Sequence, residues 1–153
     1  MNQEFEINNG ILLKYNGNSK ELYIPEGVVE IDSNAFFGAH FESVSFPSTL
    51  KKVGDYAFHS CRELKKIDFG DSVESLGFQC FDCCSSLESV KFPDSLKELG
   101  DGVFSYCGNL RSVEFGKGLV SLPEECFSNT GLKEINIPEG VSKFGIGVFY
   151  KTL

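Results

Sequence analysis

The sequence predicts a mainly β solenoid of the α/β class, with parallel strands linked by short helical or 3-10 turns. Three observations support this. A unit of 22 to 23 residues recurs six times, its apolar residues fall at the same positions in each copy, and Phe is used 15 times while Trp is absent. Refilling one position with the same residue is typical of a repeat array, in which each copy completes its neighbour's core. We therefore expect one domain.

The first 18 residues precede the repeats. They include the pair Asn16-Gly17, which favours the tight turn of a β-hairpin. We expect residues 1–18 to form an N-terminal capping hairpin. The six repeats of 22 to 23 residues then occupy residues 19–153 of the same domain.

Each repeat opens with a short strand. The segment Val44-Ser45-Phe46 alternates apolar and polar residues, which is the pattern of a half-buried strand, and it recurs 23 residues later from Ile67. Pro47 in one copy and Gly70 in the next end this strand and turn the chain.

A second short strand and a turn complete each repeat. In the segment Leu50-Lys51-Lys52-Val53 the apolar residues are three apart, so we expect this strand to be irregular. After Gly54, residues 55–60 are interpreted as one helical or 3-10 turn that places Phe58 in the core. Because neighbouring strands lie about 4.8 Å apart, the equivalent aromatic residues should form a continuous aromatic spine. Its members are Phe36, Phe58, Phe81, Phe104, Phe127 and Phe149.

The unit Cys61-x-x-Leu64-x-x-Ile67-x-Phe69-x-x-x-Val73-x-x-Leu76-Gly77-x-x-Cys80-Phe81-x-x-Cys84 resembles the BspA-type, or Treponema pallidum-type, leucine-rich repeat. The resemblance runs from about residue 20 to the end of the sequence. It implies a right-handed superhelix of the kind often found on bacterial or protist surfaces and often engaged in protein binding or adhesion. It implies no catalytic residues.

Charge and hydropathy exclude several classes of function. The formal net charge is −8 and the sequence pI is near 4.8, which disfavours nucleic acid as a partner. No apolar run exceeds three residues, as in Ile11-Leu12-Leu13, which is far too short for membrane insertion. The N-terminus has no signal-peptide pattern, so we expect a cytoplasmic location for the chain as given. A cell-surface or secreted location is expected instead if it is a fragment of a longer protein.

The six cysteines follow the repeat and are interpreted chiefly as structural thiols. Cys61, Cys84 and Cys107 are 23 residues apart, Cys80 and Cys126 precede a spine Phe, and Cys83 lies outside both series. Disulfides between neighbouring cysteines remain an alternative. A zinc site at Cys80, Cys83 and Cys84 is disfavoured, because no second ligand pair stands at metal spacing.

The sequence shows no pattern typical of an active site. His40 and His59 follow the spine Phe of their repeats and have no nucleophile pattern beside them, so we expect both at the surface. General acid–base catalysis would need one buried and one solvated carboxyl group, and the spacing of the carboxylates indicates no such pair. We therefore expect no enzyme activity, no cofactor and no metal.

The outward positions of the first strand vary between copies, whereas the inward positions do not. Polar residues on a fixed scaffold are the arrangement that repeat proteins use for macromolecular recognition, although a solvated sheet face is an equally good interpretation. We call these positions the strand strip and predict that it binds a protein partner. Its residues are Ser43, Ser45, Lys66, Asp68, Ser89, Lys91, Ser112, Glu114, Glu134 and Asn136.

The alternative function is structural or assembly work through the C-terminal edge. No polar closing repeat follows the last copy, and terminal repeats need a covered face. We expect self-association, with a homodimer as its simplest form, through Phe144, Phe149 and Tyr150.

Overall fold

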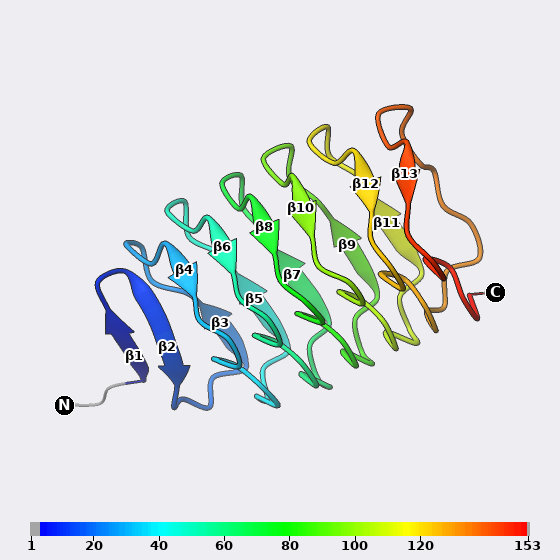
Figure 1. Cartoon of the computed structure of the whole chain (residues 1–153). Coiled ribbons are helices and arrows are strands. Elements are labelled where there is room, and N and C mark those ends of the chain that lie inside the picture. Colours follow the sequence, from blue (N-terminus) through cyan, green and yellow to red (C-terminus); the bar gives the residue numbers. More distant parts are fainter. Residues whose placement is uncertain (1–3, 153) are drawn as a thin grey trace.

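A computed structural model describes residues 4–152 and shows a solenoid of about six stacked turns (Figure 1). This confirms the predicted mainly β solenoid. Among these residues no helix is long and apolar enough to span a membrane. The strands are β1 (Phe5–Asn8), β2 (Ile11–Tyr15), β3 (Glu21–Tyr23), β4 (Glu30–Ile31), β5 (Ser43–Ser45), β6 (Lys52–Val53), β7 (Lys66–Asp68), β8 (Ser75–Leu76), β9 (Ser89–Lys91), β10 (Glu98–Leu99), β11 (Ser112–Glu114), β12 (Ser121–Leu122) and β13 (Lys143–Phe144).

The array begins with the antiparallel hairpin of β1 and β2. Its turn is formed by Asn9 and Gly10, with φ of 50° and 78°, as a two-residue hairpin turn with positive φ at both centres requires. The prediction that Asn16-Gly17 makes this turn was wrong. Asn16 lies beyond β2, where its amide donates a 2.7 Å hydrogen bond to the carbonyl of Glu4. The division of the chain at residue 18 stays a prediction.

The first strands of the repeats form one row of parallel strands, but the row is interrupted. β3, β5 and β7 make one sheet and β9 and β11 make another. Within residues 4–152 no ladder joins β7 to β9. The amide of Lys65 donates a 2.8 Å hydrogen bond to the carbonyl of Glu42, and the amide of Arg111 donates a 2.9 Å hydrogen bond to that of Glu88. Within the described residues the equivalent hydrogen bond from the Glu88 amide is absent.

The second strands form a longer row that also breaks once. The order β1-β2-β4-β6-β8-β10 is a single six-stranded sheet, in which β2 links the hairpin to the repeats by pairing parallel with β4. β12 and β13 pair separately. The two rows run side by side along the solenoid (Figure 1).

The third side of each repeat is a turn, and this is the uninterrupted side. At each of the five junctions between repeats, three turn amides donate to carbonyls of the next repeat, as when Tyr56, Phe58 and Ser60 bond to the following turn at 2.8 to 2.9 Å. We call this series the turn ladder. It continues across both positions where the sheets are broken.

The turn ladder replaces the helical or 3-10 turn predicted for residues 55–60. No helix is present among residues 4–152. The reason is the backbone: Tyr56 and Ser60 both have positive φ, near 60°, and this directs alternate amides away from the turn toward the next repeat. Two positive-φ positions recur in every copy. They are Asn34 and Gly38, Tyr56 and Ser60, Gln79 and Cys83, Gly102 and Tyr106, Glu125 and Asn129, and Gly147 and Lys151.

The predicted aromatic spine is confirmed. Ring centroids of successive spine residues are 4.8, 4.9, 5.4, 5.9 and 6.1 Å apart, with planes within 4° to 7° of parallel. The spacing therefore widens from Phe36 toward Phe149. Tyr15 of the hairpin covers the N-terminal end, with its ring 5.3 Å from that of Phe36. Phe36 to Phe127 are buried, while Phe149 is half-buried.

Candidate functional site

Most of the strand strip lies in aligned columns. Ser43 pairs with Lys66 and Ser45 with Asp68, while beyond the break Ser89 pairs with Ser112 and Lys91 with Glu114. Their side chains alternate with the buried Val44 and Val90 and the half-buried Ile67 and Val113. The Lys91 ammonium lies 3.8 Å from the Glu114 carboxylate, and both side chains are exposed.

A hollow of about 300 Å³ lies over β5, β7 and β9. Eight residues of these three strands line it, and because Ser89 and Lys91 of β9 are among them, the hollow spans the break between β7 and β9. The hollow contains the carboxylate of Asp68 and the ammonium groups of Lys66 and Lys91, with the hydroxyl of Ser89 beside them. A second hollow, of about 330 Å³, continues from the same break past Phe69 and Phe92. The strip is therefore concave where its ladder opens.

The C-terminal members of the strip are not on a strand. Residues 134–136 have no strand conformation, and Glu134 and Asn136 are exposed. Asn136 does line a hollow of about 490 Å³ together with Glu114. The structure thus places Asn136 near Glu114, whereas Glu134 lines a different hollow with Phe149 and Thr152, and neither residue is held by a ladder.

The residues predicted for self-association differ in exposure. Phe144 on β13 and Tyr150 are exposed, at 52% and 58%, whereas Phe149 is half-buried and stacks on Phe127. Ile146, which the repeat pattern does not single out, lies between Phe144 and Tyr150 in the sequence and is 80% exposed. The last repeat therefore carries a cluster of exposed apolar side chains.

The cysteines do not form disulfides, since all six are free. In the 23-residue series each thiol donates a 3.2 Å hydrogen bond to the carbonyl of a spine Phe one repeat earlier. The pairs are Cys61 with Phe36, Cys84 with Phe58 and Cys107 with Phe81. Thr152 makes the same bond with its hydroxyl. Burial raises the pKa of the Cys61 thiol to about 12, so this thiol is protonated and unreactive.

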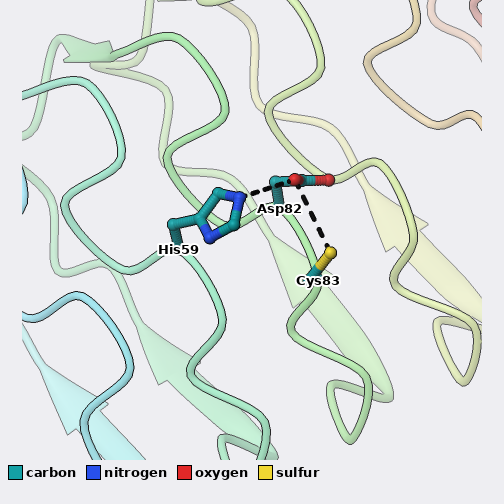
Figure 2. A group of neighbouring side chains, drawn as sticks. All are labelled: His59, Asp82 and Cys83. Atoms are coloured by element: carbon teal, nitrogen blue, oxygen red, sulfur yellow. Dashed lines mark hydrogen bonds and ion pairs between the residues drawn. The ribbon is translucent and has the colours of Figure 1, made fainter.

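His59 is not the surface residue that the sequence predicted. His40 is, with its side chain 81% exposed, but the His59 side chain is 19% exposed and its Nε2 lies 2.8 Å from Oδ2 of buried Asp82 (Figure 2). Cys83 Sγ lies 3.6 Å from the same oxygen. His59, Asp82 and Cys83, which we call the His–Asp–Cys cluster, place three ligand atoms within 4.8 Å of one another.

Neighbouring side chains hold this cluster in place. Ser60 Oγ is 2.9 Å from Nδ1 of His59, and the Ser105 hydroxyl donates to the other oxygen of Asp82. The imidazole ring also stacks on Phe37, with centroids 4.8 Å apart. A sequence signal was available, since His59, Asp82 and Ser105 are 23 residues apart and so fall in one column of the stack.

Comparisons with known proteins agree with this architecture. The family model for the BspA type leucine rich repeat region matches residues 29–153 in six copies. No curated protein matches the chain.

Several solved structures are similar. The T. pallidum leucine rich repeat protein is 29% identical with a TM-score of 0.67, and the match covers 94% of this chain and 82% of that one. A leucine rich cell surface protein from Faecalibacterium prausnitzii is 26% identical with a TM-score of 0.74, over 96% of this chain and 50% of the other. The pneumococcal vaccine antigen PcpA is similar in fold, at 24% identity and a TM-score of 0.79, over 96% and 44%. The chain thus spans half or less of two of these proteins.

Proposed function

Because the chain belongs to the BspA-type leucine-rich repeat family, we propose that it is a non-catalytic scaffold that binds a protein partner through the strand strip. The single observation that supports this most is the hollow of about 300 Å³ over β5, β7 and β9, because six of its eight lining residues belong to the strip. An aligned row of variable polar side chains on a repeat scaffold is suited to recognising an extended macromolecular surface.

The charges of the hollow indicate what a partner segment must offer. Lys66 and Lys91 are exposed ammonium groups on neighbouring strands, with Asp68 beside them. A segment with acidic side chains opposite the two lysines and a basic or amide group opposite Asp68 would complement them. The cell-surface description of the F. prausnitzii relative supports a further proposal, that this scaffold acts at a cell surface.

The test is a matched pair of double charge reversals. Lys66→Glu/Lys91→Glu changes the strip, whereas Lys51→Glu/Lys97→Glu makes the same change in net charge at exposed positions beside β6 and β10. Partners are captured from extracts by the parent chain and both variants and quantified by mass spectrometry. We expect a partner that is lost, by about tenfold or more, with the strip variant alone. Partners retained equally by both variants would contradict the proposal.

A second candidate, self-association through the last repeat, is supported by the exposed side chains of Phe144, Ile146 and Tyr150. Its test is the mass of the chain by light scattering over a range of concentrations. A Phe144→Ser/Tyr150→Ser variant should remain monomeric where the parent dimerises. Tyr23→Ser, which removes an exposed aromatic side chain on β3, is the control. A parent chain that is monomeric at every concentration would contradict this candidate.

A further inference from the structure

We propose that the His–Asp–Cys cluster is a binding site for a zinc ion, independent of the strand strip. The three side chains come from consecutive repeats, His59 from one and Asp82 and Cys83 from the next, and they converge on one point at the turn side of the solenoid (Figure 2). Imidazole nitrogen, carboxylate oxygen and thiolate sulfur are the donors that zinc takes in proteins.

The oxygen–sulfur distance fits a tetrahedral ion, the nitrogen–oxygen distance is shorter than such an ion needs, and all three ligand atoms lie within 4.8 Å of one another. With ordinary zinc–ligand bonds, a nitrogen and an oxygen ligand lie about 3.4 Å apart and an oxygen and a sulfur ligand about 3.6 Å apart. In the structure Nε2 of His59 is 2.8 Å from Oδ2 of Asp82, and this oxygen is 3.6 Å from Sγ of Cys83. Admitting the ion requires the imidazole to move about 0.6 Å away from Asp82. Water completes the fourth position, because Cys83 is only half-buried.

The groups behind the ligands also suit a metal. A zinc-bound histidine usually donates its other ring N–H to an oxygen, and ligating carboxylates are hydrogen-bonded in turn. Ser60 Oγ lies 2.9 Å from Nδ1 of His59 and can accept that N–H by rotating its hydroxyl hydrogen. Ser105 already donates to the second oxygen of Asp82. The stacked ring of Phe37 limits the orientation of His59.

The mixed donor set selects among metals. A single sulfur with nitrogen and oxygen favours zinc over calcium or magnesium, which take oxygen ligands. Binding replaces the S–H bond of Cys83 by a Zn–S bond and releases the proton to water, so no oxidant or reductant is required. The proton that Nε2 of His59 shares with Asp82 in the metal-free chain leaves this nitrogen on binding, and the ring then carries its N–H at Nδ1, toward Ser60 Oγ.

The test is calorimetric titration of the folded chain with zinc, followed by cobalt as a spectroscopic probe. We expect one equivalent of zinc to bind, and cobalt to give a thiolate-to-metal absorption band. Cys83→Ser should abolish the band and weaken zinc binding by about 100-fold or more, since loss of a supporting residue alone costs about 10- to 100-fold. His59→Gln should weaken binding as much, and Ser60→Ala by about tenfold.

His40→Ala is the matched control. Like His59 and Asp82, His40 and Glu63 are 23 residues apart and in contact, with Nδ1 of His40 3.2 Å from a carboxylate oxygen of Glu63. Unlike that pair, both side chains are exposed. This variant should bind zinc as the parent does. The proposal is overturned if the parent binds no zinc, if Cys83→Ser and His59→Gln both bind it unchanged, or if cobalt gives no thiolate band. Circular dichroism identifies any variant that has unfolded. Zinc binding by the variants that remain folded then decides whether the proposal holds.

Discussion

The ring of Phe58 lies almost parallel to the ring of Phe81, with centroids 4.9 Å apart and planes 6° from parallel. The backbone amide of Phe58 meanwhile donates a 2.8 Å hydrogen bond to the carbonyl of Cys80, the residue before Phe81. Ring stacking and the turn ladder thus act at the same position of each repeat. We conclude that this side of the solenoid holds the repeats together where the sheets are broken.

Truncating the spine should cost most in its middle. Phe81→Ala removes a fully buried ring stacked on both sides, so we expect unfolding free energy to fall by about 3–5 kcal/mol. Phe149→Ala removes a half-buried ring that stacks on Phe127 at 6.1 Å and should cost clearly less. Urea denaturation followed by circular dichroism measures both. Equal losses would show that the ends and the middle are packed alike.

The positive-φ positions predict opposite effects for two substitutions. Gly38 has φ of +69° and an added Cβ would meet no atom within 4 Å, so Gly38→Ala tests backbone strain alone. It should destabilise by about 1 kcal/mol. Glu125, exposed at φ 55°, should gain up to about 1 kcal/mol on replacement by Gly. Thermal denaturation provides the comparison, and a stabilising Gly38→Ala would contradict the assigned turn conformation.

Thiol reactivity should separate one cysteine from the other five. Cys83 is half-buried, whereas the rest are buried. We expect Ellman's reagent to modify one thiol in the folded chain at pH 8 and six after denaturation. Cys83→Ser should leave the folded chain unreactive. Fast reaction of several thiols in the native state would mean that the spine side opens readily.

Alkaline pH should destabilise the fold through the buried thiols. The pKa of Cys61 rises from 9.0 to about 12 on burial, and burial raises the pKa of Cys84 in the same direction. Between pH 9 and 12 the unfolded chain loses thiol protons that the folded chain keeps. The stability that depends on the protonated thiols is therefore fully present well below pH 9 and is lost as the pH rises toward 12. At pH 10 the buried thiol of Cys61 lowers the free energy of unfolding by about 1–2 kcal/mol relative to its value well below pH 9.

Urea midpoints at pH 8 and pH 10 measure this effect. Because lysine and tyrosine titrate in the same range, the informative quantity is the difference between the parent and Cys61→Ala. The variant should lose less stability than the parent between the two pH values. An identical loss would exclude Cys61 as a contributor.

Substitutions in the strand strip should change binding without changing stability. The ion pair between Lys91 and Glu114 is exposed on both sides, at 77% and 70%, and such pairs contribute about 0–1 kcal/mol. Lys91→Ala should therefore shift the unfolding free energy by less than about 1 kcal/mol. A larger shift would mean that the strip serves the fold rather than recognition.

Features that repeat in the sequence could be predicted, and features that depend on backbone conformation could not. The spine from Phe36 to Phe149 followed from spacing alone, and so did the alignment of Ser43 with Lys66. The turn ladder did not, because its positive-φ positions hold residues as different as Tyr56 and Gly102, without a common glycine. The hairpin turn was misplaced because the first 18 residues contain two Asn-Gly pairs.

The pairing of His59 with Asp82 was missed for a different reason. The 23-residue period is most visible in the apolar residues, but polar residues in the same column also become neighbours. The break between β7 and β9 has no local signal, since the alternation of apolar and polar residues is the same in both strands. The hollow of the strip nevertheless lies at this break.

Amide hydrogen exchange measured residue by residue tests most directly whether the turn ladder is the continuous scaffold. Backbone amides opened only by global unfolding exchange slowest. We predict that the Phe58, Phe81 and Phe104 amides are all slow, and that the Glu88 amide at the sheet break exchanges much faster than its equivalents Lys65 and Arg111. Rapid exchange of the spine amides, or equal protection of Glu88 and Arg111, would contradict the account.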